Sequence, residues 1–206
     1  MKKGTLVGAS LAVLGVVALL TATPLVGSKV GFDEAIRIAG SYASASRSPE
    51  VAVEEVMEFE DNYYVLYVEK ATGTGAFEML IDKTTGRIFP EYGPNMMWNT
   101  KYGHGAMMRG GMGGVMGGSY GGMMGGWSQP LGPAQVTAEE AERIAQRWLD
   151  EAYPGTEADE AHAFHGYYTI HVTRDGRVSG MLSVNGYTGS VWYHGWHGAF
   201  IQSREA

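Results

Sequence analysis

An internal repeat constrains the fold of this chain more than any other feature of its sequence. Three blocks match in the same order: Arg37–Ala39 with Arg143–Ala145, Phe59–Leu66 with Phe164–Ile170, and Ile81–Ile88 with Val184–Val191. The spacing between the blocks changes only slightly from one copy to the other. We therefore expect two units that share one fold.

Each copy begins with a predicted helix. In the second copy, Thr137 and Glu140 form the T-x-x-E pattern of a capping box. Apolar residues then recur at helical spacing, which indicates one buried stripe on each helix. The stripes are Ala35, Ile38, Ala39, Tyr42 and Ala43 in the first copy, and Ala141, Ile144, Ala145, Trp148, Leu149 and Ala152 in the second.

Short extended segments rich in aromatic and β-branched residues follow each helix, and turn residues separate them. They cover residues 51–59, 63–68, 77–81 and 87–89 in the first copy, and 167–172, 178–184 and 190–193 in the second. The predicted fold class is α+β, with two small domains that each pack one helix on an antiparallel β meander.

The strand and turn motifs resemble those of the PepSY family. They are Tyr64–Val68 and Leu80–Ile88 in the first copy, and Gly166–Val172 and Ser183–Val191 in the second. The second copy has Asn185 where the family usually has Asp, and Asn also suits the start of a turn. The resemblance implies a protein outside the cytoplasmic membrane that inhibits or regulates peptidases, and it supplies no catalytic residues.

The N-terminus has the pattern of an export signal. Lys2 and Lys3 precede Thr5–Gly27, a run of 23 residues without charge. This run is either a cleaved signal peptide or a retained hydrophobic helix, because it is also long enough to span a bilayer. If it is retained, it gives the protein its membrane contact. Both readings place the remaining chain outside the cytoplasm: secreted, periplasmic or anchored to the outer face of the membrane.

These features divide the chain into four parts. Residues 1–27 are the signal peptide or anchor, 28–92 are the first PepSY-like domain, 93–133 are a flexible segment, and 134–206 are the second domain. The flexible segment is rich in Gly and Met: residues 93–126 hold 13 of the 31 Gly and 8 of the 12 Met. Gly disfavours helix, so we expect no stable helix there.

The methionines suggest a site for copper(I), because thioether sulfur is a soft, neutral ligand that selects Cu(I). Two alternatives are a spacer whose methionines dock on the domains or on lipid, and a membrane-associated hairpin over Gly110–Trp127. The candidate Cu(I) ligands are Met96, Met97, His104, Met107, Met108, Met112, Met116, Met123 and Met124.

The other five histidines lie in the second copy. His194 and His197 are three residues apart in a predicted loop, where both rings can reach one divalent metal ion. The alternative is that they face solvent. His162 and His165 have the same spacing, which in a strand would direct them to opposite faces. His171 alternates with apolar neighbours, so we expect it on the surface.

Composition excludes several classes of function. The chain has no Cys, which removes disulfides, thiolate metal sites and cysteine catalysis. Its net charge of −7 argues against a nucleic-acid partner. No catalytic motif occurs, so we expect a non-enzymatic protein that binds or buffers Cu(I). The alternative is a regulatory module that acts on an extracytoplasmic protease or a membrane protein.

Overall fold

A computed structural model describes residues 29–45, 50–103 and 133–205. These residues form helices and two antiparallel sheets, which confirms the mixed helical and antiparallel class. The first copy contains α1 (Phe32–Ala45), β1 (Val51–Phe59), β2 (Asn62–Glu69), β3 (Gly75–Asp82), β4 (Ile88–Pro90) and α2 (Pro94–Met97). The second contains α4 (Ala138–Ala152), β5 (Glu157–Ala163), β6 (Tyr167–Arg174), β7 (Arg177–Asn185), β8 (Val191–Tyr193) and β9 (Phe200–Glu205).

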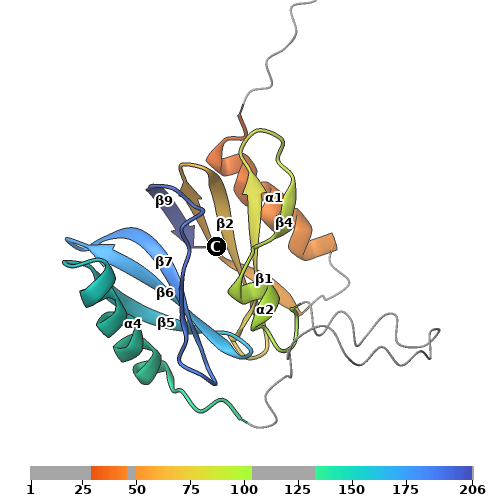
Figure 1. Ribbon diagram of the computed structural model, residues 1–206. Coiled ribbons are helices and arrows are strands. Elements are labelled where there is room, and N and C mark those ends of the chain that lie inside the picture. Colours follow the sequence, from red (N-terminus) through yellow and green to blue (C-terminus); the bar gives the residue numbers. More distant parts are fainter. Residues whose placement is uncertain (1–28, 46–49, 104–132, 206) are drawn as a thin grey trace, which may run out of the picture.

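The last strand, β9, crosses from the second copy to the sheet of the first. One sheet has the order β4-β3-β2-β1-β9 and the other has the order β5-β6-β7-β8. β9 pairs antiparallel with β1, from Glu55 opposite Glu205 to Phe59 opposite Phe200 (Figure 1). The sequence pattern predicts neither β5 nor β9. The segment 134–206 therefore contributes strands to both sheets.

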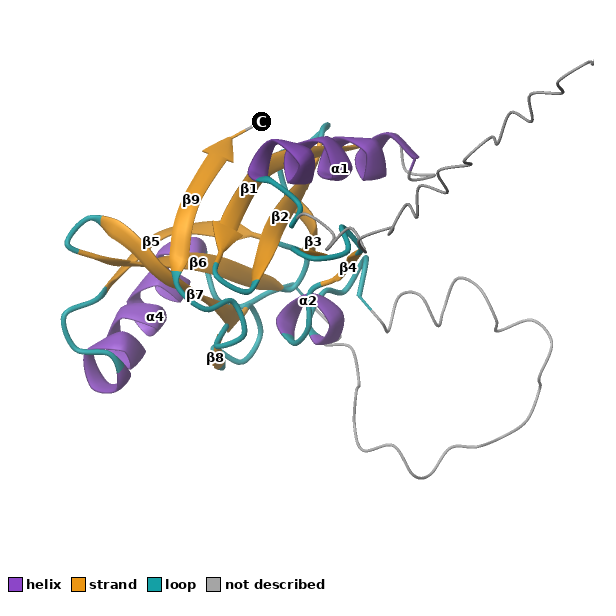
Figure 2. Ribbon diagram, turned by 90° about the horizontal axis from the view of Figure 1, so that it is seen from above, coloured by secondary structure: helices purple, strands orange, loops and turns teal. Residues whose placement is uncertain are grey.

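The two units stack as four layers, helix on sheet on sheet on helix, with α1 and α4 on the outside (Figures 1 and 2). Alternation along β2 shows how one strand serves two cores. Tyr63, Val65 and Tyr67 pack toward α1, whereas Tyr64 and Leu66 pack in the core between the sheets. β2 is consequently buried on both of its faces.

The second unit follows the same rule. On β6, Tyr168, Ile170 and Val172 belong to the core under α4, and Tyr167 belongs to the core between the sheets. Thr169 lies between these apolar positions and is fully buried. The inner faces of the sheets therefore carry polar as well as apolar side chains into the interior.

The repeated turns have the same geometry in both copies. The side chain of Asp82 accepts hydrogen bonds from two backbone N–H groups in its turn, and Asn185 does the same in the other. Gly86 and Gly189 end these turns with φ of 69° in each case, a conformation that favours glycine. Thr137 caps α4 as predicted, because its side chain accepts a hydrogen bond from the backbone N–H of Glu140.

Residues 94–103 were predicted to belong to the flexible segment without a stable helix, and this part of the prediction was wrong. Pro94–Met97 form α2, and Asn95 and Asn99 are buried. The Asn99 amide donates to the Ala76 carbonyl oxygen at 2.7 Å, so side-chain hydrogen bonds hold this stretch against β3.

Among the described residues, no helix is both long and apolar enough to cross a membrane. The predicted signal or anchor over residues 1–27 lies outside them.

The two sheets approach each other closely at Gly75, where β3 begins. Gly75 forms an isolated backbone bridge with Phe164 of the second copy. A Cβ atom at Gly75 would lie 2.5 Å from the Phe164 ring, which is closer than real Cβ contacts allow. The absence of a side chain at this position therefore lets the two units pack together.

We expect Gly75→Ala to lower the free energy of unfolding by about 1–3 kcal/mol, because the added methyl overpacks the contact with Phe164. Chemical denaturation measures the effect. Gly40→Ala is the matched control, since Gly40 lies in α1 with open space around its Cα and the change should stabilise that helix by about 0.5–1 kcal/mol. Equal effects of the two substitutions would contradict the close approach.

Glu69, at the end of β2, forms a second polar link between the units. Its Oε1 atom lies 2.6 Å from Lys101 Nζ and 2.7 Å from His165 Nε2, and it accepts from Tyr102 Oη at 2.9 Å. The hydrogen bond from Lys101 is the main reason that the pKa of Glu69 falls to about 2, and the other partners lower it further against the effect of burial.

The lowered pKa predicts a pH-dependent contribution to stability. The folded state favours ionised Glu69, so the contribution is complete above its ordinary pKa of 4.5 and is lost as pH falls toward about 2. We expect Glu69→Gln to destabilise the protein at pH 7, and the deficit to shrink between pH 4.5 and 2. Denaturation across this range checks it, with the exposed Glu151→Gln as control; a deficit independent of pH would contradict the assignment.

Candidate metal centre between the sheets

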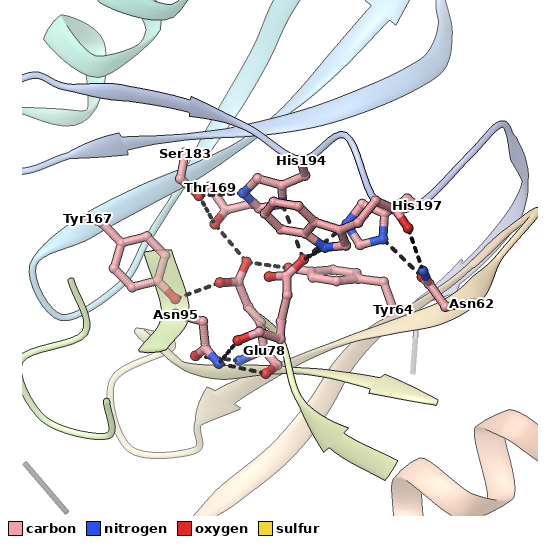
Figure 3. A network of polar contacts seen from close by, with 11 residues as sticks. Asn62, Tyr64, Glu78, Asn95, Tyr167, Thr169, Ser183, His194 and His197 are labelled. Atoms are coloured by element: carbon pink, nitrogen blue, oxygen red, sulfur yellow. Dashed lines mark hydrogen bonds and ion pairs between the residues drawn. The ribbon is translucent and has the colours of Figure 1, made fainter. Parts of the chain in front are cut away.

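A network of buried polar side chains lies between the two sheets (Figure 3). β2 and β3 contribute Tyr64 and Glu78 from one side, and β6 and β7 contribute Tyr167, Thr169 and Ser183 from the other. The remaining members are Asn62 of β2, Asn95 of α2, and four residues of the loops that follow β4 and β8: Glu91, His194, Trp196 and His197. Charged groups in the interior must be paired and hydrogen-bonded, so each contact here has energetic weight.

Glu78 is fully buried, and three hydroxyl groups surround its carboxylate. Tyr64 Oη and Thr169 Oγ1 donate to Oε1 at 2.6 and 2.7 Å, and Tyr167 Oη donates to Oε2 at 2.6 Å. The Asn95 side chain fixes the backbone of this residue, since it accepts from the Glu78 N–H and donates to the Glu78 carbonyl oxygen. Both sheets thus converge on one carboxylate.

Glu91 is the second buried carboxylate, and two histidine rings face the same oxygen of it. Its Oε1 atom lies 3.2 Å from His194 Nδ1 and 3.0 Å from His197 Nε2. Neither contact has the geometry of a hydrogen bond, so both of these ring nitrogens are buried without a hydrogen-bond partner. The other carboxylate oxygen, Glu91 Oε2, is also buried without one. All three side chains are at most 2% exposed, which makes the unmatched atoms costly.

The hydrogen bonds on the far side of each ring assign the histidine tautomers. Thr169 uses its proton on Glu78, so Ser183 donates to Thr169 and His194 Nε2 donates to Ser183 at 3.0 Å. On the other ring, His197 Nδ1 donates to the Asn62 side-chain oxygen at 2.9 Å. In the neutral rings, His194 Nδ1 and His197 Nε2 are therefore the unprotonated nitrogens, and these are the two atoms that lie beside Glu91 Oε1.

Burial and neighbouring charges shift the pKa values of Glu78, Glu91, His194 and His197 in different directions. Burial and the charge of Glu91 raise the pKa of Glu78. Burial also opposes ionisation of Glu91, but the charge of His194 and the further interactions with both histidines together outweigh it, and the pKa of Glu91 is lowered. Burial lowers the pKa of His197, whereas the attraction of Glu91 overcomes burial at His194 and raises its pKa. The site is therefore built around a negative carboxylate that attracts positive charge.

This arrangement has the composition of a transition-metal site. One ligand atom from each of Glu91, His194 and His197 lies within 4.8 Å of the other two. Two ligands that bind Zn²⁺ at about 2.0–2.1 Å with a tetrahedral angle are about 3.3 Å apart, close to both measured N···O separations. The outer hydrogen bonds to Ser183 and Asn62 orient the rings as partners of metal-bound histidines do.

The structure brings together only some of the predicted site residues. His194 and His197 are adjacent in a loop, as the proposed divalent site requires, and they are buried rather than solvent-facing. Glu91 was not predicted from the sequence, because it lies far from both histidines along the chain and belongs to no motif. His162 and His165 do not share a site; His165 contacts Glu69 instead.

Two further predictions concern residues away from this centre. His171 was expected on the surface, and this was wrong: its side chain is only 13% exposed, and burial lowers its pKa to about 4. The sheet of the other unit covers the face of the strand on which His171 lies.

Of the candidate Cu(I) ligands, Met96 and Met97 are half-buried at α2. The other candidate Cu(I) ligands lie outside the described residues: His104, Met107, Met108, Met112, Met116, Met123 and Met124.

Comparisons with known proteins give one structural similarity. No protein-family model and no curated protein matches the sequence. Among solved structures, the chain is similar to the C-terminal domain of YpeB from Bacillus megaterium, with 12% identity and a TM-score of 0.27. The alignment covers 81% of this chain and 63% of that one, so the chain spans less than two thirds of the length of that structure.

The network predicts unequal effects for two neighbouring tyrosines. Tyr167→Phe removes a donor from a buried carboxylate and should cost about 1.5–3 kcal/mol at pH 8. Tyr168→Phe removes a hydrogen bond to the neutral Val136 carbonyl and should cost about 0.5–1.5 kcal/mol. Chemical denaturation compares the two, and a larger loss for Tyr168→Phe would contradict the assigned role of Glu78.

Proposed function

We propose that this protein is a non-enzymatic, extracytoplasmic metal-binding protein that holds a divalent transition-metal ion between its two sheets. Glu91, His194 and His197 would supply the ligands. The observation that carries the proposal is that three buried ligand atoms, two of them ring nitrogens without hydrogen-bond partners, lie within 4.8 Å of one another. A cation at this point would satisfy the unmatched atoms and compensate the buried carboxylate charge.

The ligand types restrict the choice of ion. Two imidazoles and one carboxylate suit Zn²⁺, Cu²⁺, Ni²⁺ or Fe²⁺, and they disfavour Ca²⁺ and Mg²⁺, which prefer oxygen ligands. A site that is buried on all sides favours retention of the ion over rapid exchange. This role is compatible with the proposed Cu(I) binding by the Gly/Met-rich segment, which rests on the sequence alone.

The centre joins the two repeats physically. Glu91 follows the last strand of the first unit, while both histidines belong to the loop between β8 and β9. Metal binding would therefore strengthen the packing of the two units, because the ion attaches to both. That each unit is PepSY-like is part of this proposal and rests on the repeated motifs. A role in peptidase regulation remains a prediction from that resemblance.

The test is the binding of Zn²⁺ to the purified full-length chain. Zn²⁺ is the probe because neutral thioethers select Cu(I) and reject zinc, so the methionines should not contribute. We expect one tightly held ion that resists a weak chelator and raises the melting temperature. His194→Gln/His197→Gln should abolish this tightly held ion and the thermal shift that it causes.

His165→Gln is the matched control, since it removes a histidine of the same unit that lies outside the centre. It should leave the tightly held ion in place. Co²⁺ substitution adds a spectroscopic readout, because tetrahedral Co²⁺ with nitrogen ligands absorbs strongly in the visible range. Retention of the tight ion and its spectrum in the double variant would refute the proposed centre.

A further inference from the structure

A second cluster of histidines and carboxylates lies at another place between the sheets. It lines a groove of about 660 Å³ that opens to solvent. β1 and β9 contribute Glu54, Glu55 and Glu205 on one side, and β5 and β6 contribute Asp159, His162 and His171 on the other. None of these residues belongs to the centre around Glu91.

The inner part of the cluster is a pair held in place by burial. His171 Nε2 lies 3.5 Å from Glu55 Oε2, and the two side chains are 13% and 12% exposed. Nε2 itself is fully buried and has no hydrogen-bond partner among the described residues. As in the buried centre, the separation suits two ligands of one ion better than a direct hydrogen bond.

The outer part of the cluster is more accessible. His162 Nδ1 lies 4.0 Å from Glu54 Oε2, and these side chains are 31% and 39% exposed. The His162 and His171 rings are adjacent, with centroids 5.4 Å apart. Rotation of the His162 and Glu54 side chains would bring their ligand atoms toward the inner pair.

We propose that His171 and Glu55, completed by His162 and Glu54, form a second, exchangeable binding site for a divalent transition-metal ion. The site does not depend on the buried centre or on the proposed function. Two imidazoles select transition metals over Ca²⁺ and Mg²⁺. The carboxylates that line the groove, including Asp159 and Glu205, attract a dication and partly neutralise it. Access through the groove makes this site the one that exchanges ions with solvent.

The experiment measures Zn²⁺ binding to the full-length chain in the His194→Gln/His197→Gln background, which lacks the ligands of the buried centre. We expect one remaining Zn²⁺ site that binds more weakly. Adding His162→Gln should lower its affinity about 10-fold or more, because one of the imidazole ligands is lost. His165→Gln in the same background should not change it.

The imidazole NMR signals of His162 and His171 give a readout that structural effects alone would not produce. The signals of both rings should shift together as Zn²⁺ is added, whereas the imidazole signals of His165 should not shift. The wild-type background repeats the test if the double variant fails to fold: His162→Gln should then weaken the second equivalent of Zn²⁺ and leave the first unchanged. Unchanged affinity in His162→Gln, or an absence of shifts at both histidines, would overturn the proposal.

Discussion

The burial of two carboxylates between the sheets is the constraint on which the rest of this structure depends. Glu78 and Glu91 have no exposed surface, so the surrounding residues must supply donors or positive charge for both. The first receives three hydroxyl donors from both sheets, and the second faces two histidines. Donors from both sheets therefore meet at Glu78, and this carboxylate links the packing of the two units.

The buried polar residues between the sheets also help to explain why the two repeats do not form independent domains. In addition to the apolar contacts around Phe164, the units share β9, which leaves the second copy to complete the sheet of the first. The loop that carries His194 and His197 leads into that strand, and its backbone bonds to Glu60 and Asp61 fix its position. An ion held by this loop and by Glu91 would therefore act on the assembly of both units.

Much of each unit could be predicted from sequence, because local chemistry specifies it. The capping box at Thr137, the apolar stripes of α1 and α4, and the turns at Asp82 and Asn185 all form as expected. The error at residues 94–103 has a physical cause. Gly-rich composition predicts flexible chain, but Asn95 and Asn99 supply hydrogen bonds to β3 that no local pattern reveals.

The sequence by itself determined which residues share a face of each strand, because side chains alternate with a period of two. It placed His171 opposite Ile170 and Val172, and it placed His194 and His197 in one loop. Only the tertiary structure decided what covers each face. The alternation of polar and apolar residues along a strand does not show whether the polar face meets solvent or another sheet. The polar faces of these strands were therefore predicted to lie on the surface. Glu91 joined the histidines through packing between distant parts of the chain, which no spacing in the sequence records.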